Sequence, residues 1–323
     1  MFENLLDPAI LCFVVGLLAG LLRSNLRLPS QVYEALSLYL LFSIGLKGGV
    51  ELSKAPIAAT IFPSVAAITL GVTIPIIAYN ILKRLGRFNK VDAAAIAAHY
   101  GSVSAVTYAV VLSFLHRTGV SVEPFVTVLL VILEIPAIAV GVFIASKHTE
   151  EDPKVEKKKW ATLFHEVFLG KTIYLLIAGL FVGYFAGPER VAMIGPVFID
   201  LFKGALAFFL LEMGVITSQR FSELKRKSLF LVGFGILMPI LSGSLGCVLG
   251  YFSGLSVGGT TVLATLAASA SYIAAPAAIR IALPKANLTL CLTASLGITF
   301  PFNVVLGIPI YFWMSQMLHL WGG

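Results

Sequence analysis

Two short polar clusters interrupt long apolar segments of the sequence. They read Gly101-Ser-Val-Ser104 and Ser269-Ala-Ser-Tyr272, and Pro276 follows the second cluster. Glycine and serine allow a helix to end, and proline cannot continue the helical hydrogen-bond ladder. A helix that breaks inside a membrane exposes backbone N–H groups, which are tolerated where they line a cavity. Each cluster therefore predicts a broken helix beside a cavity.

Two such breaks facing each other would carry a particular chemistry. The N-terminus of a half-helix attracts anions, because its free N–H groups and its dipole are positive. The opposing carbonyl ends and hydroxyls can coordinate a cation such as Na⁺. The alternative is that the small residues only let helices pack closely. We favour a binding site, because the two clusters occupy equivalent positions in the two halves of the chain.

Acidic residues lie deep in two other apolar segments. An ionisable group inside a membrane is costly and is usually functional. Glu134 directly precedes Ile135-Pro136, so the helix is weakened beside it, and it could bind a cation or relay a proton. The alternative for Glu134, and for the second acid, Glu212, is pairing with the backbone or with a buried lysine. Lys171 and Lys203 are the lysines available within apolar segments.

Three further ionisable groups have simpler interpretations. Asp200 and Lys203 are three positions apart and predict a local ion pair on one helix face. Asp92 opens the fourth apolar segment and fits an acid in the first turn of a helix. His99 precedes the first break, where a hydrogen-bonded packing role is favoured over titration.

The sequence carries no enzyme motif. Its five histidines show no H-E-x-x-H spacing, and it has neither a P-loop nor a G-x-S-x-G sequence. Its three cysteines show no metal-binding spacing. We therefore expect neither an enzyme nor an ATP-driven pump, no cofactor, and no metal beyond a coupling Na⁺.

Composition places the chain in a membrane. Of the 323 residues, 58% are hydrophobic and 12% are charged, and the mean hydropathy is +0.95. A soluble domain of this size has too little interior to hide so much apolar surface, and a disordered chain needs low hydrophobicity. The apolar residues suffice for about ten spans of about 20 residues each. The predicted fold class is an all-α, polytopic membrane protein.

Ten apolar segments can be marked, and one long charged connection divides them. That connection, residues 147–162, separates a first half, 1–146, from a second half, 163–323, with five segments in each. The segments are 5–22, 30–46, 56–82, 91–115, 124–146, 163–186, 196–218, 228–253, 258–283 and 287–319.

Lysine and arginine are distributed unevenly over the connections between these segments. The odd-numbered connections hold 17 of them, and the even-numbered connections hold 4. The positive-inside rule then predicts that both termini face outside and that 147–162 is cytoplasmic, in a plasma (inner) membrane. The net charge of +7 reflects this orientation signal, so we expect no nucleic-acid partner.

The second half of the chain weakly repeats the first. Because five is an odd number, a tandem five-helix unit must enter the membrane from opposite sides, which predicts an inverted repeat with breaks in helices four and nine. The matches are 40–45 with 209–214 and 97–105 with 266–274, both at an offset of 169, and 133–136 with 298–301 at an offset of 165.

These motifs together resemble the sodium-dependent bicarbonate transporter family, the SbtA-type permeases, in a wider bacterial branch. The resemblance runs over nearly the whole chain. The residues that carry it are Ile44-Gly-Leu-Lys-Gly-Gly49, Val91-Asp92, Gly101-Ser-Val-Ser104, Glu134-Ile-Pro136, Arg280, Leu283-Pro-Lys-Ala-Asn287 and Ser295-Leu-Gly-Ile-Thr-Phe-Pro301.

The resemblance implies a core domain and a gate domain, each assembled from both repeats, and a homotrimer. It implies that bicarbonate moves inward with Na⁺, bound where the two broken helices cross. In cyanobacterial members a PII-like regulatory protein docks on the cytoplasmic side, although the connection 147–162 is short here.

The resemblance also transfers site residues to this chain. At the second break the cyanobacterial members have a serine-rich run ending in Asp, and in the fifth segment they have Asp where this chain has Glu134. The implied substrate-binding residues are Gly101, Ser102, Val103, Ser104, Ala270, Ser271 and Tyr272, and the candidate cation ligands are Ser269, Glu134 and Thr299.

Three other functions remain open from the sequence. The first is a proton-coupled transporter of a small organic anion that uses Glu134. The second is a passive anion channel, which could not accumulate its solute. The third is a membrane receptor or scaffold whose broken helices only pack.

Overall fold

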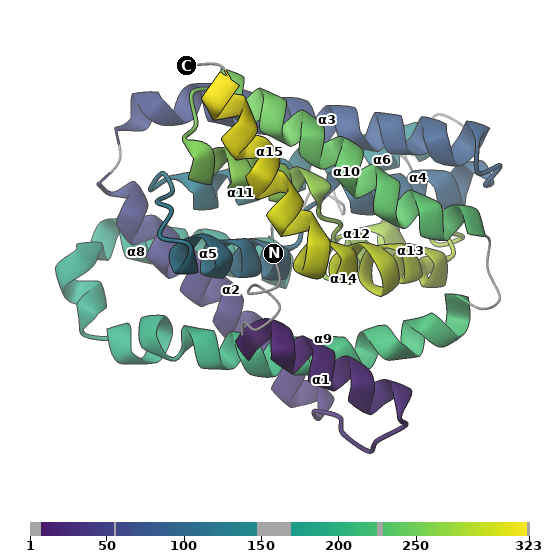
Figure 1. Cartoon of the computed structure of the whole chain (residues 1–323), viewed down its shortest axis with the longest axis horizontal. Helices are drawn as coiled ribbons and strands as arrows, with labels where there is room; N and C mark the ends of the chain where they lie inside the picture. Colours follow the sequence, from purple (N-terminus) through teal and green to yellow (C-terminus); the bar gives the residue numbers. More distant parts are fainter. Residues whose placement is uncertain (1–7, 55, 147–168, 225–228, 322–323) are drawn as a thin grey trace.

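The computed structural model describes residues 8–54, 56–146, 169–224 and 229–321. All regular structure in these ranges is helical, so the predicted all-α class is confirmed. The charged connection 147–162 lies outside the described residues. In Figure 1, α3 and α10 run close to the long axis of the view, and α15 runs obliquely to them.

The described residues of the first half form six α-helices. The second and third are separated by a 3₁₀ turn, η2, at Ile57–Thr60. The α-helices are α1 (Pro8–Leu21), α2 (Ser30–Leu52), α3 (Ile61–Arg84), α4 (Lys90–Gly101), α5 (Ala105–Arg117) and α6 (Val126–Ser146).

The described residues of the second half form helices of very different lengths, from 3 residues in α14 to 24 in α10. The first of them bends at Gly187, where the φ angle of 71° suits glycine because it has no Cβ. The elements are α8 (Lys171–Ala192), η3 (Pro196–Asp200), α9 (Phe202–Leu224), α10 (Leu229–Phe252), α11 (Val257–Ala268), α12 (Ala274–Ala282), α13 (Leu288–Ala294), η4 (Ser295–Thr299), α14 (Phe300–Phe302), η5 (Asn303–Gly307) and α15 (Ile308–Trp321). Here η3, η4 and η5 are π-helical turns.

Six helices of the described residues are long and apolar enough to cross a membrane. Three shorter apolar helices accompany them: Pro8–Leu21, Val126–Gly141 and Val257–Ala268. The six long ones are Ser30–Leu52, Ala58–Arg84, Lys90–Arg117, Ile173–Ala192, Leu229–Phe252 and Leu288–Trp321.

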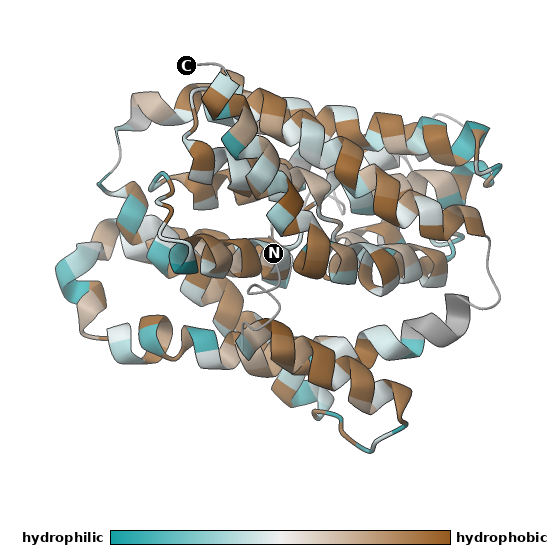
Figure 2. Cartoon of the chain, viewed as in Figure 1, coloured by the Kyte–Doolittle hydropathy of each residue, from teal (hydrophilic) through white to brown (hydrophobic). Residues whose placement is uncertain are grey.

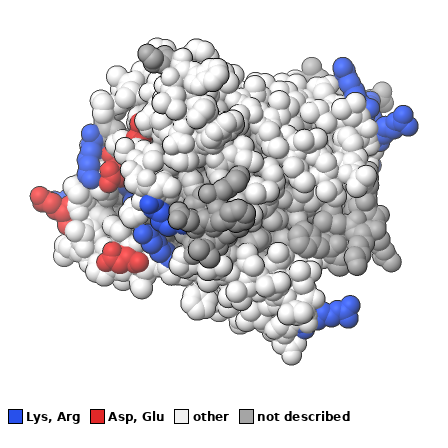
Figure 3. Space-filling model, in the orientation of Figure 1, with Lys and Arg blue, Asp and Glu red and all other residues white. Residues whose placement is uncertain are grey.

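Charged residues and hydrophobic residues occupy different parts of the long helices (Figure 2 and Figure 3). In Figure 2, brown, the colour of hydrophobic residues, predominates along the long helices. On the face shown in Figure 3, the lysine, arginine and acidic residues gather toward the two ends of the long helices, and the described atoms between them are uncharged. This distribution suits helices whose middles contact lipid.

The helices pack as two groups. In the first, which we call the four-helix group, α1 packs on α9 and α2 packs on α8. In the second, the crossed-helix group, α3 and α6 pack on α4, and α10 and α15 pack on α11. Figure 1 shows α1 and α9 along the lower edge, with α3 and α10 along the upper edge.

The closest approaches in the four-helix group occur at glycines. A Cβ at Gly45 in α2 would lie 2.3 Å from the Leu176 carbonyl oxygen of α8. A Cβ at Gly214 in α9 would lie 2.1 Å from the Phe13 carbonyl oxygen of α1. These two glycines end the segments that match at an offset of 169. Each therefore lets two backbones touch, as small residues do between membrane helices.

Several apolar segments were predicted to end about six residues too early. The second was expected to end at residue 46, whereas α2 continues to Leu52 and includes Lys47, and α8 and α9 likewise continue to Ala192 and Leu224. The glycine-rich turn after Lys47 stays helical because it packs tightly on α8 and on Thr127 of α6. Tertiary packing here overrides the low helix propensity of glycine.

We expect Gly45→Ala to destabilise the protein, because the new methyl group would force α2 and α8 apart. Overpacking of this kind costs about 1–3 kcal/mol. The measurement is the thermal unfolding midpoint of the purified protein in detergent. The control is Gly204→Ala, because a Cβ at Gly204 meets no atom within 4 Å. Equal midpoints for the two variants would contradict the packing argument.

Candidate functional site

Both predicted helix breaks are present. Helix α4 ends at Gly101 and α5 begins at Ala105, while α11 ends at Ala268 and α12 begins at Ala274. In Figure 1, α4 and α12 lie on one side of the molecule, and α5 and α11 lie on the other. The two broken helices therefore run antiparallel through the crossed-helix group, and their breaks meet at its centre.

The two breaks begin alike. Helices α4 and α11 have 12 residues each, and both their starts and their ends lie 167 positions apart. Ser102 and Ser269 occupy the residue after each helix, with nearly identical extended backbone angles (φ −82°, ψ 162° and φ −78°, ψ 165°). The predicted repeat offset of 169 is therefore two positions too large before the breaks. It is correct after them, where α5 and α12 begin 169 positions apart, because the second break is two residues longer than the first.

A second serine starts each following half-helix. The Thr107 N–H donates to Ser104 Oγ at 3.1 Å, at the start of α5. The Ala275 N–H donates to Ser271 Oγ at 3.1 Å, at the start of α12. A serine oxygen that accepts from a first-turn N–H stabilises a helix start by about 1 kcal/mol. The hydroxyls of Ser104 and Ser271 thus position the two N-termini.

Three hydrogen bonds join the two breaks. The Ser104 N–H donates to Ser269 Oγ at 2.9 Å, and the Ser271 N–H donates to the His99 carbonyl oxygen at 2.8 Å. The Ser104 hydroxyl donates to Tyr272 Oη at 3.3 Å. Because all these groups are buried, each bond satisfies a polar group that has no access to water.

Glu134 of α6 faces the first break. The Ser102 hydroxyl donates to Glu134 Oε1 at 2.8 Å, and the Val103 N–H donates to Glu134 Oε2 at 3.3 Å. The residue is only 4% exposed. Its carboxylate therefore sits just before the N-terminus of α5, where a negative charge is favoured.

The second break has its own polar partner, which sequence reasoning missed. Asn303, in the π-helical turn η5, donates from Nδ2 to the Ala268 carbonyl oxygen at 2.8 Å. The Tyr311 hydroxyl donates to Asn303 Oδ1 at 2.9 Å. Asn303 satisfies the last carbonyl group of α11, which the break leaves without a helical partner. An amide inside the apolar segment 287–319 was the available signal.

A small cavity of about 20 Å³, which we call the site cavity, lies beside the point where the two broken helices cross. Ile173 and Leu176 of α8 close its far side, so it lies where the crossed-helix group meets the four-helix group. Its volume is close to that of one water molecule. Among the predicted site residues, those that line it are Val103, Ser104, Glu134, Ser271 and Tyr272.

The other predicted site residues are buried near the cavity but do not line it. Ser269 uses its hydroxyl to accept from Ser104 and to donate to the Leu266 carbonyl oxygen at 2.8 Å. Thr299 donates to the Gly235 carbonyl oxygen at 2.7 Å, and its hydroxyl also bonds the Tyr100 hydroxyl at 2.7 Å. Gly101, Ser102 and Ala270 are buried and do not line the cavity.

The apolar wall of the cavity could not be found in the sequence. Leu130, Ile173 and Leu176 line it beside the polar groups. Each is one apolar residue in an apolar helix, with no distinguishing neighbour. Only the packing of α6 and α8 against the breaks identifies them.

Two acids fix the ends of the broken helices. Asp92, in the first turn of α4 as expected, accepts from the Asn287 N–H at 2.7 Å, just before α13. Glu123, in the connection between α5 and α6, accepts from the Ser256 N–H at 2.5 Å, just before α11. Each acid ties the start of one broken helix to the connection that follows the other. We call these two contacts the end clamps.

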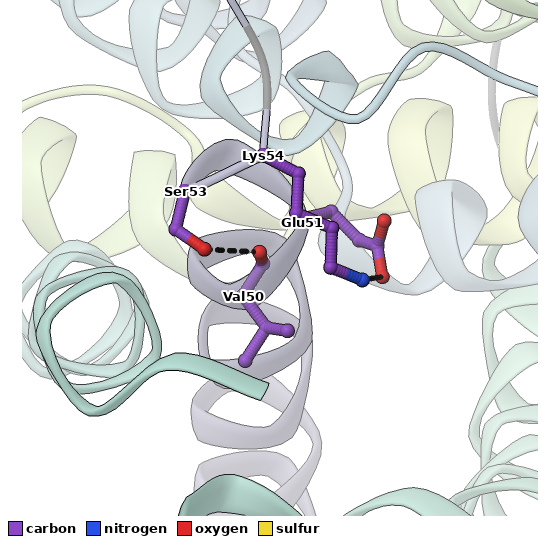
Figure 4. A network of polar contacts seen from close by, with 4 residues as sticks. All are labelled: Val50, Glu51, Ser53 and Lys54. Carbon is purple, nitrogen blue, oxygen red and sulfur yellow. Dashed lines mark hydrogen bonds and ion pairs between the residues drawn. The ribbon is translucent and has the colours of Figure 1, made fainter. Parts of the chain in front are cut away.

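A much larger cavity, the wide cavity, opens between α2, α5, α6 and α9, and its volume is about 320 Å³. Lys47 and Lys203 line it and form no ion pair within the described residues. The predicted pair of Asp200 with Lys203 is therefore wrong. Of the two acids in its lining, Glu123 forms an end clamp and Glu51 pairs with Lys54 at 3.1 Å (Figure 4).

The remaining buried acid has a structural partner. Glu212 of α9 accepts from the Leu28 N–H at 2.8 Å and so holds the connection between α1 and α2. The backbone alternative for Glu212 is the one observed. Lys171, at the start of α8, pairs with the exposed Glu34 and not with a buried acid.

Comparison with known families identifies the type of protein. A family model described as the Na⁺-dependent bicarbonate transporter superfamily matches residues 8–316. The resemblance inferred from the motifs is thereby confirmed. A search of curated proteins gave no significant match.

The end clamps lead to a stability prediction. Glu123→Ala removes the acceptor of the exposed Ser256 N–H at the start of α11, and a hydrogen bond to a charged group contributes about 1.5–3 kcal/mol. The control is Glu51→Ala, which removes an exposed ion pair worth about 0–1 kcal/mol. Unfolding in detergent should separate the two variants. An equal loss would show that the Glu123 clamp adds no more than a surface pair.

Proposed function

Because the chain belongs to the Na⁺-dependent bicarbonate transporter superfamily, we propose that it is a secondary active transporter that moves bicarbonate across the plasma membrane with Na⁺. The observation that carries this proposal is the meeting of two broken helices at one small cavity. Serine hydroxyls, the Val103–Ser104 backbone and one carboxylate surround that cavity. Such a site offers donors to an anion and oxygens to a cation.

Bicarbonate and Na⁺ would bind different groups of the site, because an anion needs hydrogen-bond donors and a cation needs oxygen ligands. Bicarbonate is planar and accepts hydrogen bonds, so it suits the N–H groups and hydroxyls at the two breaks: Gly101, Ser102, Val103, Ser104, Ala270, Ser271 and Tyr272. Na⁺ prefers oxygen ligands, for which Glu134, Ser269 and Thr299 are the candidates. Glu134 lines the cavity directly, whereas the hydroxyls of Ser269 and Thr299 would have to exchange the partners they hold here.

The proposed architecture is ten helices in two inverted repeats, 1–146 and 163–323, joined by the cytoplasmic connection 147–162. Three observations support it. Inverted-repeat symmetry would superpose the α1·α9 pair on the α8·α2 pair, because each pair joins the first helix of one half to the second helix of the other. Gly45 and Gly214 make equivalent contacts in those pairs. The first half-helices α4 and α11 have equal length.

Transport would require the two groups of helices to move against each other. The site cavity holds about one water molecule, so bicarbonate cannot fit until the walls separate. The crossed-helix group, the proposed core, is tied together by the hydrogen bonds at the breaks and by the end clamps. The four-helix group, the proposed gate, contributes only apolar residues to the cavity wall, so it can separate without breaking polar contacts there.

The wide cavity provides a route to the site. A third, smaller cavity shares Ile44 and Ala109 with the wide cavity and shares Ala105 and Ile273 with the site cavity. By the positive-inside rule, with both termini outside, the wide cavity opens to the exterior. We propose that bicarbonate enters there and that a homotrimer is the assembled form. A PII-like regulator could contact only the cytoplasmic side.

A proton-coupled carrier is the second candidate, favoured by the burial of Glu134 at the cavity. A passive channel fits less well, because the site cavity is too small for an ion to pass with its hydration shell.

The decisive experiment is uptake of radiolabelled bicarbonate into proteoliposomes with and without an inward Na⁺ gradient. Uphill accumulation that needs Na⁺ is expected. The double variant Ser102→Leu, Ser271→Leu should abolish it, while Ser30→Leu, at an exposed helix start, should not. Accumulation driven by a proton gradient alone would favour the second candidate, and dissipation of every imposed gradient would indicate a channel.

The two lysines of the wide cavity should attract the anion. We expect the double variant Lys47→Gln, Lys203→Gln to raise KM for the anion about two- to tenfold with little change in kcat, because it weakens electrostatic steering. The effect should shrink at high ionic strength. Lys54→Gln, which removes an exposed lysine paired with Glu51, is the matched control. If the double variant has the same KM as the wild type, the wide cavity is excluded as the entry route.

A further inference from the structure

We infer that the Glu134 carboxylate is a tethered stand-in for the transported anion, and that a cation must draw it away before the anion can bind. This inference rests on the proposed function, because it assigns the coupling between the two ligands to one residue. It starts from the observation that the donors best suited to an anion at the first break are already occupied.

The occupied donors are specific. Glu134 takes the Ser102 hydroxyl at 2.8 Å and the Val103 N–H at 3.3 Å, one with each carboxylate oxygen. The next N–H along the chain, that of Ser104, is committed to Ser269 Oγ. An anion arriving at the first break, just before α5, a helix of 13 residues, therefore finds Glu134 already bound to the Ser102 hydroxyl and the Val103 N–H.

Carboxylate and bicarbonate compete because they present the same acceptors. Both place two oxygens on one planar carbon, so two donors that hold one can hold the other. The cavity that Glu134 shares with Ser104, Ser271 and Tyr272 is about 20 Å³, which leaves no room for a second planar anion. Two negative charges side by side in this buried site would also repel each other strongly. The two donors can therefore hold either the Glu134 carboxylate or the transported anion, but not both at once.

The carboxylate is also poorly compensated. Glu134 is 4% exposed, and within the described residues it forms no ion pair with a lysine, arginine or histidine. Both of its hydrogen-bond partners are neutral. A buried charge held only by neutral donors is costly, so a cation entering the cavity would bind this carboxylate strongly.

Coupling then follows from competition. A cation that binds Glu134 pulls the carboxylate off Ser102 and Val103, and this frees both donors for bicarbonate. The bound bicarbonate in turn keeps Glu134 available to the cation. Each ligand strengthens the binding of the other by the same factor, as linkage requires.

The test compares Glu134→Gln with the wild-type protein and with Glu212→Gln. Glutamine keeps an acceptor oxygen at the break but removes the charge. Glu212 is equally buried but accepts from Leu28, outside the site, so its substitution is the matched control. The measurement is the Kd of radiolabelled bicarbonate for the purified protein, with Na⁺ and with choline in its place.

In the wild type and in Glu212→Gln, we expect Na⁺ to tighten bicarbonate binding about 5- to 150-fold, the usual range of coupling between two sites. In Glu134→Gln, bicarbonate should bind in choline nearly as tightly as it binds to the wild type in Na⁺, and Na⁺ should no longer change Kd. Loss of bicarbonate binding by Glu134→Gln in both media would overturn the inference, because it would make Glu134 a required ligand and not a competitor.

A second arm does not depend on the identity of the cargo. Glu134→Ala deletes the carboxylate, so formate, the smallest carboxylate, should refill the vacated donors and raise the unfolding temperature of this variant but not of the wild type. Absence of formate rescue overturns the inference. Formate rescue together with no bicarbonate binding by the wild type would keep the stand-in role and reject the proposed cargo.

Discussion

Backbone polar groups cannot go unpaired inside a membrane, and this constraint organises the centre of the molecule. Each broken helix frees N–H and carbonyl groups at residues 102–104 or 269–273. The two breaks satisfy one another through the Ser104 N–H to Ser269 and the Ser271 N–H to His99. Neither break could exist alone at this depth without partners from the other or from α6 and η5.

The same constraint explains why polar residues are placed on otherwise apolar helices. Glu134 accepts the donors of the first break, and Asn303 donates to the last carbonyl of α11 at the second. Glu134 thus accepts from donors that the first break leaves without helical partners, whereas Asn303 donates to a carbonyl that the second break leaves without one. The first break therefore has a charged partner and the second a neutral one.

The two groups of helices are held at the site by different kinds of contact. The crossed-helix group is held by hydrogen bonds at its centre and by the Asp92 and Glu123 clamps at its ends. The four-helix group touches the cavity only through apolar side chains such as Ile173 and Leu176. Apolar contacts have no directional preference and can slide or separate at low cost. The boundary between the groups is therefore the natural place for an opening movement.

The sequence was sufficient to predict the breaks and the acid beside them, because both depend on residue types that are rare in apolar helices. It misplaced the register of α4 and α11 alone, by two positions, since the longer second break cannot be seen in a pattern of small residues. It also treated Asp200 and Lys203 as partners, although Lys203 lines the wide cavity. The apolar wall from α8 depends on contacts between distant segments, which no local pattern encodes.

The most direct test of the central claim is a structure of the protein determined in sodium bicarbonate and compared with one in choline chloride. If the breaks form the anion site, density for a planar anion should lie within hydrogen-bond distance of Ser104 and Ser271, and Glu134 should have left the Val103 N–H. Anion density confined to the wide cavity, with every contact at the breaks unchanged, would contradict the account.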